Sequence, residues 1–334
     1  MRICEINDIA SVASELARGL EERGHEVPLI QPDLVGGSLP KALKPLVAPA
    51  RAMEWARIAR WVSAGHFDAV HIHYAYLGMI GVLGRFPYIL HCHGSDVRDM
   101  ARYSRPMVER ALTGATHVYY STPDLAQYIL PIRPDAEFLP NPIDTETFRP
   151  LSDASESTGV LICCALAEVK GADLILEACQ RLADERPDIR ITAIEGGEYT
   201  EAFRALPNVT MISHQDRGDL PAIIGRHGIV IGQVRLGAVG MAELEAMACG
   251  RPVVAWFNEN SSYDIPPPFL NARDPEAIAG AVKRLVDAPV AREVMGAAGR
   301  EWVIEHHALD LITERVERKA EQLATANQVA VAAR

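Results

Sequence analysis

Short apolar runs alternate along the chain with longer stretches in which apolar residues recur every three or four positions. The first run, residues 2–6, has the pattern of a buried strand, and residues 9–23 carry the spacing of an amphipathic helix. Gly24 is placed to end that helix, and a second apolar run follows at 26–30. This strand–helix–strand order is typical of β-α-β units and predicts a parallel sheet.

The same alternation continues through the first half of the chain. A helix is predicted near residues 50–64, and apolar strands at 68–74, 87–93 and 116–121. These strands contain many β-branched and aromatic residues, which suits strands buried on both faces. The polar, turn-rich segment 151–158 ends this series, and we expect the domain linker there.

A second series of elements follows. Strands are predicted at 160–166, 189–194, 210–213, 229–231 and 252–256, and helices at 172–182 and 240–248. Beyond Asp274 the pattern is helical in at least three segments to about residue 325, and the tail after Thr325 is expected to fray. Two series of similar size predict two Rossmann-like α/β domains.

Length and charge fit this interpretation. A single hydrophobic core stops growing at about 250–300 residues, so a chain of 334 residues favours two domains. The net charge of −11 disfavours a surface built to bind nucleic acid, because such a surface needs clustered Lys and Arg.

Cysteine usage and hydropathy indicate the compartment. The six cysteines form no Cys-x-x-Cys pair and lie mostly in apolar runs, so we expect buried free thiols in a reducing compartment. No apolar stretch reaches the ~18 residues of a membrane span, and no signal-peptide pattern opens the sequence. The expected location is therefore the cytoplasm, with no transmembrane segment.

Residues 240–254 (GMAELEAMACGRPVV) carry the strongest chemical signal. Gly240 opens a helix, whose N-terminal N–H groups and dipole favour an anion such as a diphosphate. Glu245 lies one turn further, where its carboxylate could accept two hydrogen bonds from a ribose. The alternative is a buried helix in which Glu245 is a cap or a salt-bridge partner.

The string EAMACGRPVV at 245–254 resembles the donor-site helix of glycosyltransferase family 4. Further segments resemble that family in the same order. They are 16–27 (LARGLEERGHEV), 139–150 (LPNPIDTETFRP), 170–174 (KGADL), 195–197 (EGG) and 274–285 (DPEAIAGAVKRL). The resemblance implies that Glu245 binds the ribose of a nucleotide sugar, and that Gly240, Met241, Glu195, Gly196 and Gly197 also contact the donor.

The resemblance also implies the GT-B fold, with two facing Rossmann-like domains built on parallel sheets. The first would bind the acceptor, the second the donor, and the last helix would cross back to the first. The expected boundaries are 1–152 for the N-terminal domain, 153–310 for the C-terminal domain, and 311–334 for the returning helix and tail.

Lys170 follows a strand directly and begins a helix, so it is expected at the crevice where parallel strands end. A point charge there can neutralise a departing diphosphate, and the family resemblance favours that role. An exposed lysine before a glycine turn is the alternative.

The segment HCHGSD, residues 91–96, ends another strand. His93 resembles the family's histidine near the donor sugar, with a purely structural histidine as the alternative. His91 shares its face but lies deeper, so we interpret it as structural; His73 is a weaker candidate behind the site. Asp96 and Asn7 are candidate acceptor-binding residues. The histidines lack metal-ligand spacing, so no metal is predicted.

Three positions depart from the family pattern. Gly237 stands where the family commonly has a donor-binding Glu, and Ala165 where it has an Arg. Residues 7–10 (NDIA) replace the Gly-Gly of the first loop. Gln233 or Arg235 could take over part of the donor contact.

The resemblance implies a retaining, metal-independent glycosyltransferase that needs no cofactor and uses a UDP- or GDP-sugar as donor. The acceptor would be a small molecule, glycan or lipid, held by variable N-terminal loops such as 31–50. Ala165 and Gly237 leave open a degenerate, non-catalytic nucleotide-sugar-binding protein. A GT-B nucleotide-sugar epimerase is the other alternative, but it needs acid–base carboxylates around the sugar, so the missing Glu argues against it.

Overall fold

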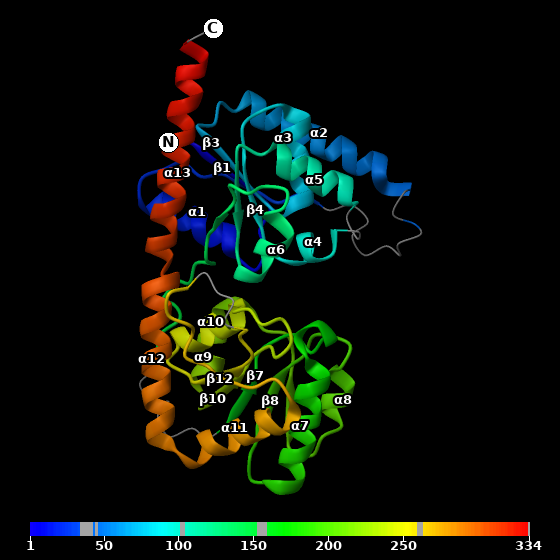
Figure 1. Ribbon diagram of the computed structural model, residues 1–334, viewed down its shortest axis with the longest axis vertical. Helices are drawn as coiled ribbons and strands as arrows, with labels where there is room; N and C mark the ends of the chain where they lie inside the picture. The colour runs from blue at the N-terminus through cyan, green and yellow to red at the C-terminus, as the bar shows by residue number, and fades with distance from the viewer. Residues whose placement is uncertain (34–42, 44–45, 101–103, 152–158, 259–262, 333–334) are drawn as a thin grey trace. The chain divides into compact units, whose positions relative to one another are not determined.

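The computed structural model describes residues 1–33, 43, 46–100, 104–151, 159–258 and 263–332, with side chains to Thr325. Contacts divide the chain into two compact units. Unit 1 comprises Met1–Pro142 and Leu309–Arg334, and unit 2 comprises Ile143–Ala308. Each unit has a six-stranded parallel sheet flanked by helices (Figure 1), so the predicted α/β fold is confirmed. Most of the predicted linker, 152–158, lies outside the described residues, and the predicted domain boundaries stay predictions.

The sheet of unit 1 has the strand order β2-β1-β3-β4-β5-β6. Its strands are β1 (Ile3–Ile6), β2 (Leu29–Ile30), β3 (Ala69–His73), β4 (Ile89–Cys92), β5 (His117–Tyr120) and β6 (Glu137–Phe138). Its helices are α1 (Val12–Glu22), α2 (Ala48–Ala64), α3 (Met79–Gly84), α4 (Ser95–Arg98), α5 (Arg105–Gly114), α6 (Ala126–Ile129) and α13 (Leu309–Ala332). Helix α13 continues past Thr325, after which the sequence predicts a frayed tail.

The two faces of this sheet differ in chemistry. Alternate strand residues, among them Ile6, Ile72 and Leu90, form an apolar core with α2, α3 and α5. The residues between them face the opposite side, where α1 packs against β1 and α13 against β3. That second face carries fully buried polar side chains, including Glu5 and His71. The strands are thus buried on both faces, as predicted, but only one face is apolar.

Unit 2 repeats the architecture with the strand order β12-β11-β10-β7-β8-β9. Its strands are β7 (Val160–Ile162), β8 (Ile191–Ile194), β9 (Val209–Ile212), β10 (Ile229–Ile231), β11 (Val253–Ala255) and β12 (Leu270–Asn271). Its helices are α7 (Ala172–Glu185), α8 (Thr200–Arg204), α9 (Leu220–Gly225), α10 (Met241–Ala248), α11 (Pro275–Asp287) and α12 (Pro289–His307).

Both faces of this second sheet are apolar. Ile162 and Ile231 face a core formed with α7 and α11. Leu161 and Val230 face the other core, which α10 and α12 complete. With its strands fixed on both sides, the sheet gives a rigid base to the loops that leave its carboxyl edge.

No helix in the described part of the chain combines the length and the apolar character needed to cross a bilayer.

Helix α13 contributes an apolar stripe to unit 1, which allows a matched test of its packing. Ile312 is fully buried, whereas its neighbour Leu311 is 37% exposed. We expect Ile312→Ala to lower the free energy of unfolding by about 2–4 kcal/mol, because it leaves a cavity. Leu311→Ala should cost well under ~1 kcal/mol. Urea unfolding of both variants measures the difference, and equal losses would contradict this packing.

Candidate functional site

The carboxyl edge of the unit 2 sheet brings most of the predicted donor residues together. A pocket of about 360 Å³ opens there, lined by residues that follow β7, β8 and β9 and by the first turns of α10. The predicted residues that line it are Glu195, Gly196, Gly197 and Glu245. Lys170, Gln233, Gly240 and Met241 are not among the lining residues, but they lie in the loops after β7 and β10 and at the start of α10.

A glycine turn forms one wall of this pocket. Gly196 and Gly197 have φ angles of +150° and +130°, which residues other than glycine rarely adopt. Leu166 N–H donates to the Gly196 carbonyl at 2.7 Å, and Tyr199 N–H donates to the Leu166 carbonyl at 3.0 Å. A Cβ on Gly197 would collide with the Leu166 carbonyl. The turn therefore presents bare backbone to the pocket.

Glu195 precedes this turn and is already ion-paired. Its carboxylate accepts a hydrogen bond from the Arg204 guanidinium at 2.5 Å. Glu195 is therefore held at the rim of the pocket.

A single carboxylate fixes the start of α10. Glu243 accepts from the Gln233 N–H at 2.6 Å through Oε1 and from the Gly240 N–H at 2.8 Å through Oε2. This cap joins the loop after β10 to the helix start. The next N–H groups, of Met241 and Ala242, belong to the first turn, where backbone donors lack partners within the helix.

The side chain of Gln233 supports its own loop. Its amide nitrogen donates to the carbonyls of Ala238 and Trp256, and its oxygen accepts from the N–H groups of Arg235 and Leu236. These four bonds use the full capacity of the amide group. We therefore interpret Gln233 as the residue that shapes this loop, and donor contact by it stays a prediction.

Arg235, the other residue expected to compensate for the missing family residues, is also engaged. Its guanidinium lies 2.5 Å from the Asp173 carboxylate and 3.7 Å from that of Glu168. It is thus tied to the segment that follows β7.

Lys170 lies in that same segment, at the end of a short 3₁₀ helix, Glu168–Lys170. The Val234 N–H donates to the Lys170 carbonyl at 2.9 Å, which holds the lysine loop against the loop that leads to α10. Within the described part of the chain the Lys170 ammonium makes no ion pair. Its charge is therefore available to an anion.

Glu245 forms the salt bridge that the sequence left open as an alternative, and its contact with a ribose stays a prediction. Its Oε1 accepts from Arg217 Nε at 3.0 Å, and the Glu245 side chain is only 6% exposed. Glu245 also lines the pocket, so a salt bridge holds the carboxylate that the family resemblance assigns to the ribose.

Arg217 was not predicted. It begins a short 3₁₀ helix, Arg217–Asp219, after the polar loop that follows β9, and His214 and Gln215 of that loop line the pocket. No periodicity or motif marks this segment, so only the folded structure shows that it reaches Glu245.

The structure accounts for one departure from the family pattern. Gly237 has a φ of +67°, and a Cβ there would lie 3.1 Å from atoms of Asn258 and Trp256. A glutamate at this position would be both strained and crowded. The conformation of this loop favours glycine at position 237, which explains why the Glu of the family pattern is missing there.

The second departure, Ala165, lies in the pocket wall beside Cys163 and Cys164. All six cysteines are free thiols, and five of them are buried. Burial raises the pKa of Cys164 to about 12, so this thiol stays protonated at neutral pH. The pocket therefore offers apolar sulfur and methyl groups where the family has a guanidinium.

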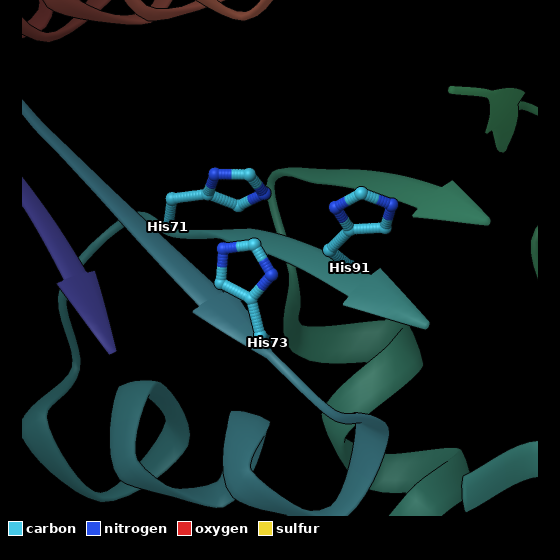
Figure 2. A group of neighbouring side chains, drawn as sticks. All are labelled: His71, His73 and His91. Carbon is cyan, nitrogen blue, oxygen red and sulfur yellow. The ribbon is translucent and has the colours of Figure 1, made fainter. Parts of the chain in front are cut away.

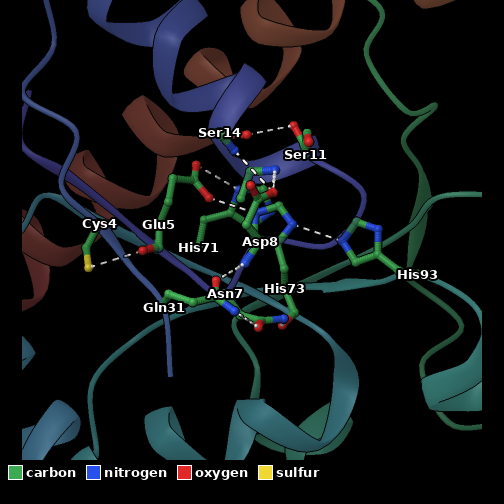
Figure 3. A network of polar contacts seen from close by, with 11 residues as sticks. Cys4, Glu5, Asn7, Asp8, Ser11, Ser14, Gln31, His71, His73 and His93 are labelled. Atoms are coloured by element: carbon green, nitrogen blue, oxygen red, sulfur yellow. Dashed lines mark hydrogen bonds and ion pairs between the residues drawn. The ribbon is translucent and has the colours of Figure 1, made fainter. Parts of the chain in front are cut away.

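In unit 1, the predicted residue His93 follows β4 and is half-buried. Figure 3 shows a chain of polar contacts leading to it. His93 Nε2 lies 2.9 Å from His73 Nδ1, and His73 Nε2 lies 2.7 Å from Glu5 Oε2. Glu5 also contacts His71 Nδ1 at 3.2 Å through its other oxygen.

The protonation states of Glu5, His73 and His93 follow from their burial and from the groups beside them. Burial alone would raise the pKa of Glu5, but His71 and His73 hold it down to about 2. Burial lowers the pKa of His73 and of His93, so both rings are neutral. The Glu5 carboxylate then accepts the Nε2–H of His73, whose Nδ1 accepts the Nε2–H of His93. His93 Nδ1 is left as a hydrogen-bond acceptor.

Asp96 lies next to His93 but is fully buried. It accepts hydrogen bonds from the backbone N–H groups of Ala75 and Gly94, both at 2.7 Å, and of His93 at 3.2 Å. Burial raises the pKa of Asp96, and these donors oppose that effect. We interpret Asp96 as the residue that shapes the loop presenting His93, whereas its predicted contact with an acceptor stays untested.

Asn7, the other predicted acceptor residue, is buried as well. It donates to the His73 carbonyl at 3.2 Å and accepts from Gln31 Nε2 at 3.2 Å, so it joins the ends of three strands. Its φ is +71°, and Ala10 and Ser11 have φ values of +51° and +61°. The loop thus keeps the left-handed backbone that glycines favour, although none of these residues is glycine.

A larger pocket, about 720 Å³, lies at the opposite edge of the unit 2 sheet. Gly228 and Pro252 in its lining precede β10 and β11, so it opens at the amino ends of the strands. In open parallel sheets, ligands bind outside the carboxyl ends. The smaller pocket is therefore the candidate functional site of unit 2. The predicted acceptor loop 31–50 falls largely outside the described residues.

Comparison with known families agrees with this geometry. The family model described as Glycosyltransferase Family 4 matches residues 9–147, and the one described as Glycosyl transferases group 1 matches residues 144–302. The first match covers most of the strands of unit 1, and the second contains the whole candidate pocket of unit 2.

Curated relatives match the chain at low identity. A GDP-mannose-dependent monoacylated alpha-(1-6)-phosphatidylinositol monomannoside mannosyltransferase of Corynebacterium glutamicum is 25% identical over 210 residues, 55% of each chain. A GDP-mannose-dependent alpha-(1-6)-phosphatidylinositol monomannoside mannosyltransferase of Mycolicibacterium smegmatis is 30% identical over 205 residues, 51% of this chain and 52% of that protein. The chain thus spans about half the length of these two relatives.

Solved structures share the fold over nearly the whole chain. Sucrose-phosphate synthase from Thermosynechococcus elongatus superposes with a TM-score of 0.77 at 17% identity, covering 98% of this chain and 100% of that one. Anabaena HepE in complex with UDP and glucose gives 0.73 at 13% identity, covering 96% and 99%. The two adjoining family matches and this shared architecture show that the chain belongs to glycosyltransferase family 4 and has the GT-B fold.

Proposed function

We propose that the protein transfers a sugar from a nucleoside diphosphate to an acceptor hydroxyl, with retention of anomeric configuration. The observation that carries this proposal is the pocket at the carboxyl edge of unit 2. It combines a buried carboxylate, a bare glycine turn and a helix N-terminus, and the adjoining loop carries Lys170, which makes no ion pair with a described residue.

Donor binding is assigned to Glu245 and the glycine turn. Glu245 accepts hydrogen bonds from the ribose hydroxyls, while Arg217 holds its carboxylate in place. The backbone of Gly196 and Gly197 can approach the nucleotide closely because no side chain intervenes. Neither contact distinguishes UDP from GDP. The first two relatives are named as GDP-mannose-dependent and HepE binds UDP, so both nucleotides are candidate leaving groups.

Lys170 and the start of α10 are assigned to the stabilisation of the departing diphosphate. The Lys170 ammonium and the N–H groups of Met241 and Ala242 stabilise the negative charge that develops on the leaving group. Glu243 caps Gly240 and so fixes the orientation of these donors before the substrate binds. Such positioning needs no divalent cation at the diphosphate.

His93 is assigned to a sugar hydroxyl. Its Nδ1 accepts a hydrogen bond, and the contact of its Nε2 with His73 fixes the ring. The acceptor class is a small molecule, glycan or lipid. Because the relatives' names specify phosphatidylinositol mannosides or inositol 3-phosphate, inositol phosphates and inositol lipids come first in a screen.

The non-catalytic alternative has a specific observation in its favour. Ala165 and Gly237 remove two groups that the family uses near the donor, and the positive φ of Gly237 disfavours a side chain at that position. Such a protein would bind the nucleotide without turnover. An epimerase would need acid–base carboxylates around the sugar, and both glutamates that line the pocket are paired with arginines.

Nucleotide binding is the first expected outcome. UDP or GDP at ~100 times its Kd should stabilise the protein by about 2.7 kcal/mol, which is a shift of several degrees in Tm. The shift should be the same with and without Mg²⁺, because Lys170 and α10 supply the positive charge. Thermal unfolding with UDP, GDP, ADP and dTDP measures this. No shift with any of the four would contradict a donor site in this pocket.

Turnover should depend on Lys170 and Glu245. Lys170→Ala should lower kcat about 10²–10³-fold, because it removes a charge that stabilises the leaving group. Glu245→Gln should raise the KM for the donor while largely keeping the shape of the site. Lys283→Ala is the matched control, because Lys283 forms an exposed ion pair with Glu185 elsewhere in unit 2. Product release followed by NMR also reports the anomeric configuration; unchanged rates in both site variants would overturn the assignment.

Introducing the Glu of the family pattern at position 237 should destabilise the protein. Gly237→Glu is expected to lower Tm and not to raise turnover, because φ is positive and the space is occupied. Gly237→Ala serves as the control for backbone strain, which costs ~1–2 kcal/mol, together with the crowding of the Cβ atom, without the rest of the Glu side chain. Thermal unfolding and donor turnover of both variants measure the effect. A Gly237→Glu protein with native stability and higher activity would show that the loop can be rebuilt.

A further inference from the structure

We propose that His71, His73 and His91 of unit 1 form a buried site for a divalent transition-metal ion, with Zn²⁺ as the best match. The site uses no residue of the candidate pocket of unit 2, but it shares His73 with the contact that fixes the His93 ring. Figure 2 shows the three rings gathered above neighbouring strands.

The register of the sheet brings these rings together. β3 and β4 pair in parallel with His73 opposite His91, and His71 lies two residues earlier on the same face of β3. One ligand nitrogen from each ring lies within 4.8 Å of the others, and all three side chains are fully buried. The rings of His71 and His91 stack with centroids 5.4 Å apart and planes inclined by 6°.

Three of the ring nitrogens lack a partner. His71 Nε2 and both nitrogens of His91 are buried and make no hydrogen bond to any described residue. The Leu139 N–H lies near His91, but it donates to the Tyr120 carbonyl at 3.0 Å. An unsatisfied buried polar group costs about 1–3 kcal/mol, and such groups are rare in folded proteins. A bound ion would satisfy His71 Nε2 and one of the two His91 nitrogens.

The contacts of Glu5 with two of the rings also support a metal site. Glu5 accepts from His71 Nδ1 at 3.2 Å and from His73 Nε2 at 2.7 Å. Each of these two rings therefore directs its remaining lone pair, on His71 Nε2 and His73 Nδ1, away from the carboxylate. Histidines that bind metals almost always donate their other N–H to a carboxylate, a carbonyl or water. The Glu5 charge would also offset that of the ion.

The donor set selects the ion. Neutral imidazoles suit Zn²⁺, Cu²⁺ and Ni²⁺, whereas Mg²⁺ and Ca²⁺ need oxygen ligands. Zn–N bonds of about 2.0–2.1 Å place tetrahedral ligands ~3.3 Å apart, so modest side-chain rotations close the present separations. In the metal-free protein His73 Nδ1 accepts the Nε2–H of His93. A bound ion would take the position of that hydrogen atom, so His93 Nε2 would lose its proton. His93 Nε2, 2.9 Å from His73 Nδ1, is the nearest remaining donor for the fourth position.

Metal uptake by the untagged, chelator-treated full chain tests the proposal. We expect one equivalent of Zn²⁺ or Co²⁺ per chain, a rise in Tm, and the visible absorption bands of four-coordinate Co²⁺ with nitrogen ligands. Glu5→Gln should weaken the affinity about 10–100-fold, as loss of a supporting carboxylate does.

Two further variants separate metal binding from folding. His91→Leu removes two unpartnered nitrogens, so the metal-free variant should be at least as stable as the metal-free parent. It should lose the Co²⁺ bands and the metal-dependent rise in Tm. His66→Asn removes a histidine outside the cluster, at a φ of +50° that Asn tolerates, and should bind metal normally. A parent protein that takes up no ion, or a His91→Leu protein that binds as tightly as the parent, overturns the proposal.

Discussion

Parallel strand register is the constraint on which both sites depend. Parallel strands end at one edge of a sheet, so loops far apart in the sequence leave from the same place. In unit 2 this edge unites the Lys170 loop, the glycine turn after β8 and the loop that Glu243 fastens to α10. In unit 1 the register sets Glu5 beside His71 and His73 beside His91. A slip of one residue in β3 would turn both of its histidines into the apolar core and dissolve the cluster.

Much of this architecture was predictable, because strands buried on both faces leave long apolar runs. The strands β1, β3, β4 and β5 lie inside the runs predicted from the sequence. Strands β6 and β12 have two residues each, too few to create a periodic signal, and the helices α3, α4 and α6 are only one or two turns long.

The candidate site was predictable only where a motif fixes the backbone. Glu245 and the turn Gly196–Gly197 lie in the pocket wall because strand, turn and helix place them there. The partners of single side chains depend on tertiary packing instead. Arg217 reaches Glu245 from an unpatterned segment, Gln233 is turned into its own loop, and Asp96 is enclosed by backbone N–H groups. The histidines of β3 and β4 likewise have no metal-ligand spacing in the sequence, and only strand pairing joins them.

The placement of α13 has a consequence for the order of folding. Unit 2 is continuous in sequence, whereas unit 1 begins at Met1 and is completed by Leu309–Arg334. During synthesis, domains generally fold as units as they emerge. Unit 2 can therefore finish before unit 1, although most of unit 1 is made first. Until α13 has been synthesised, the face of the first sheet that this helix contacts stays partly uncovered.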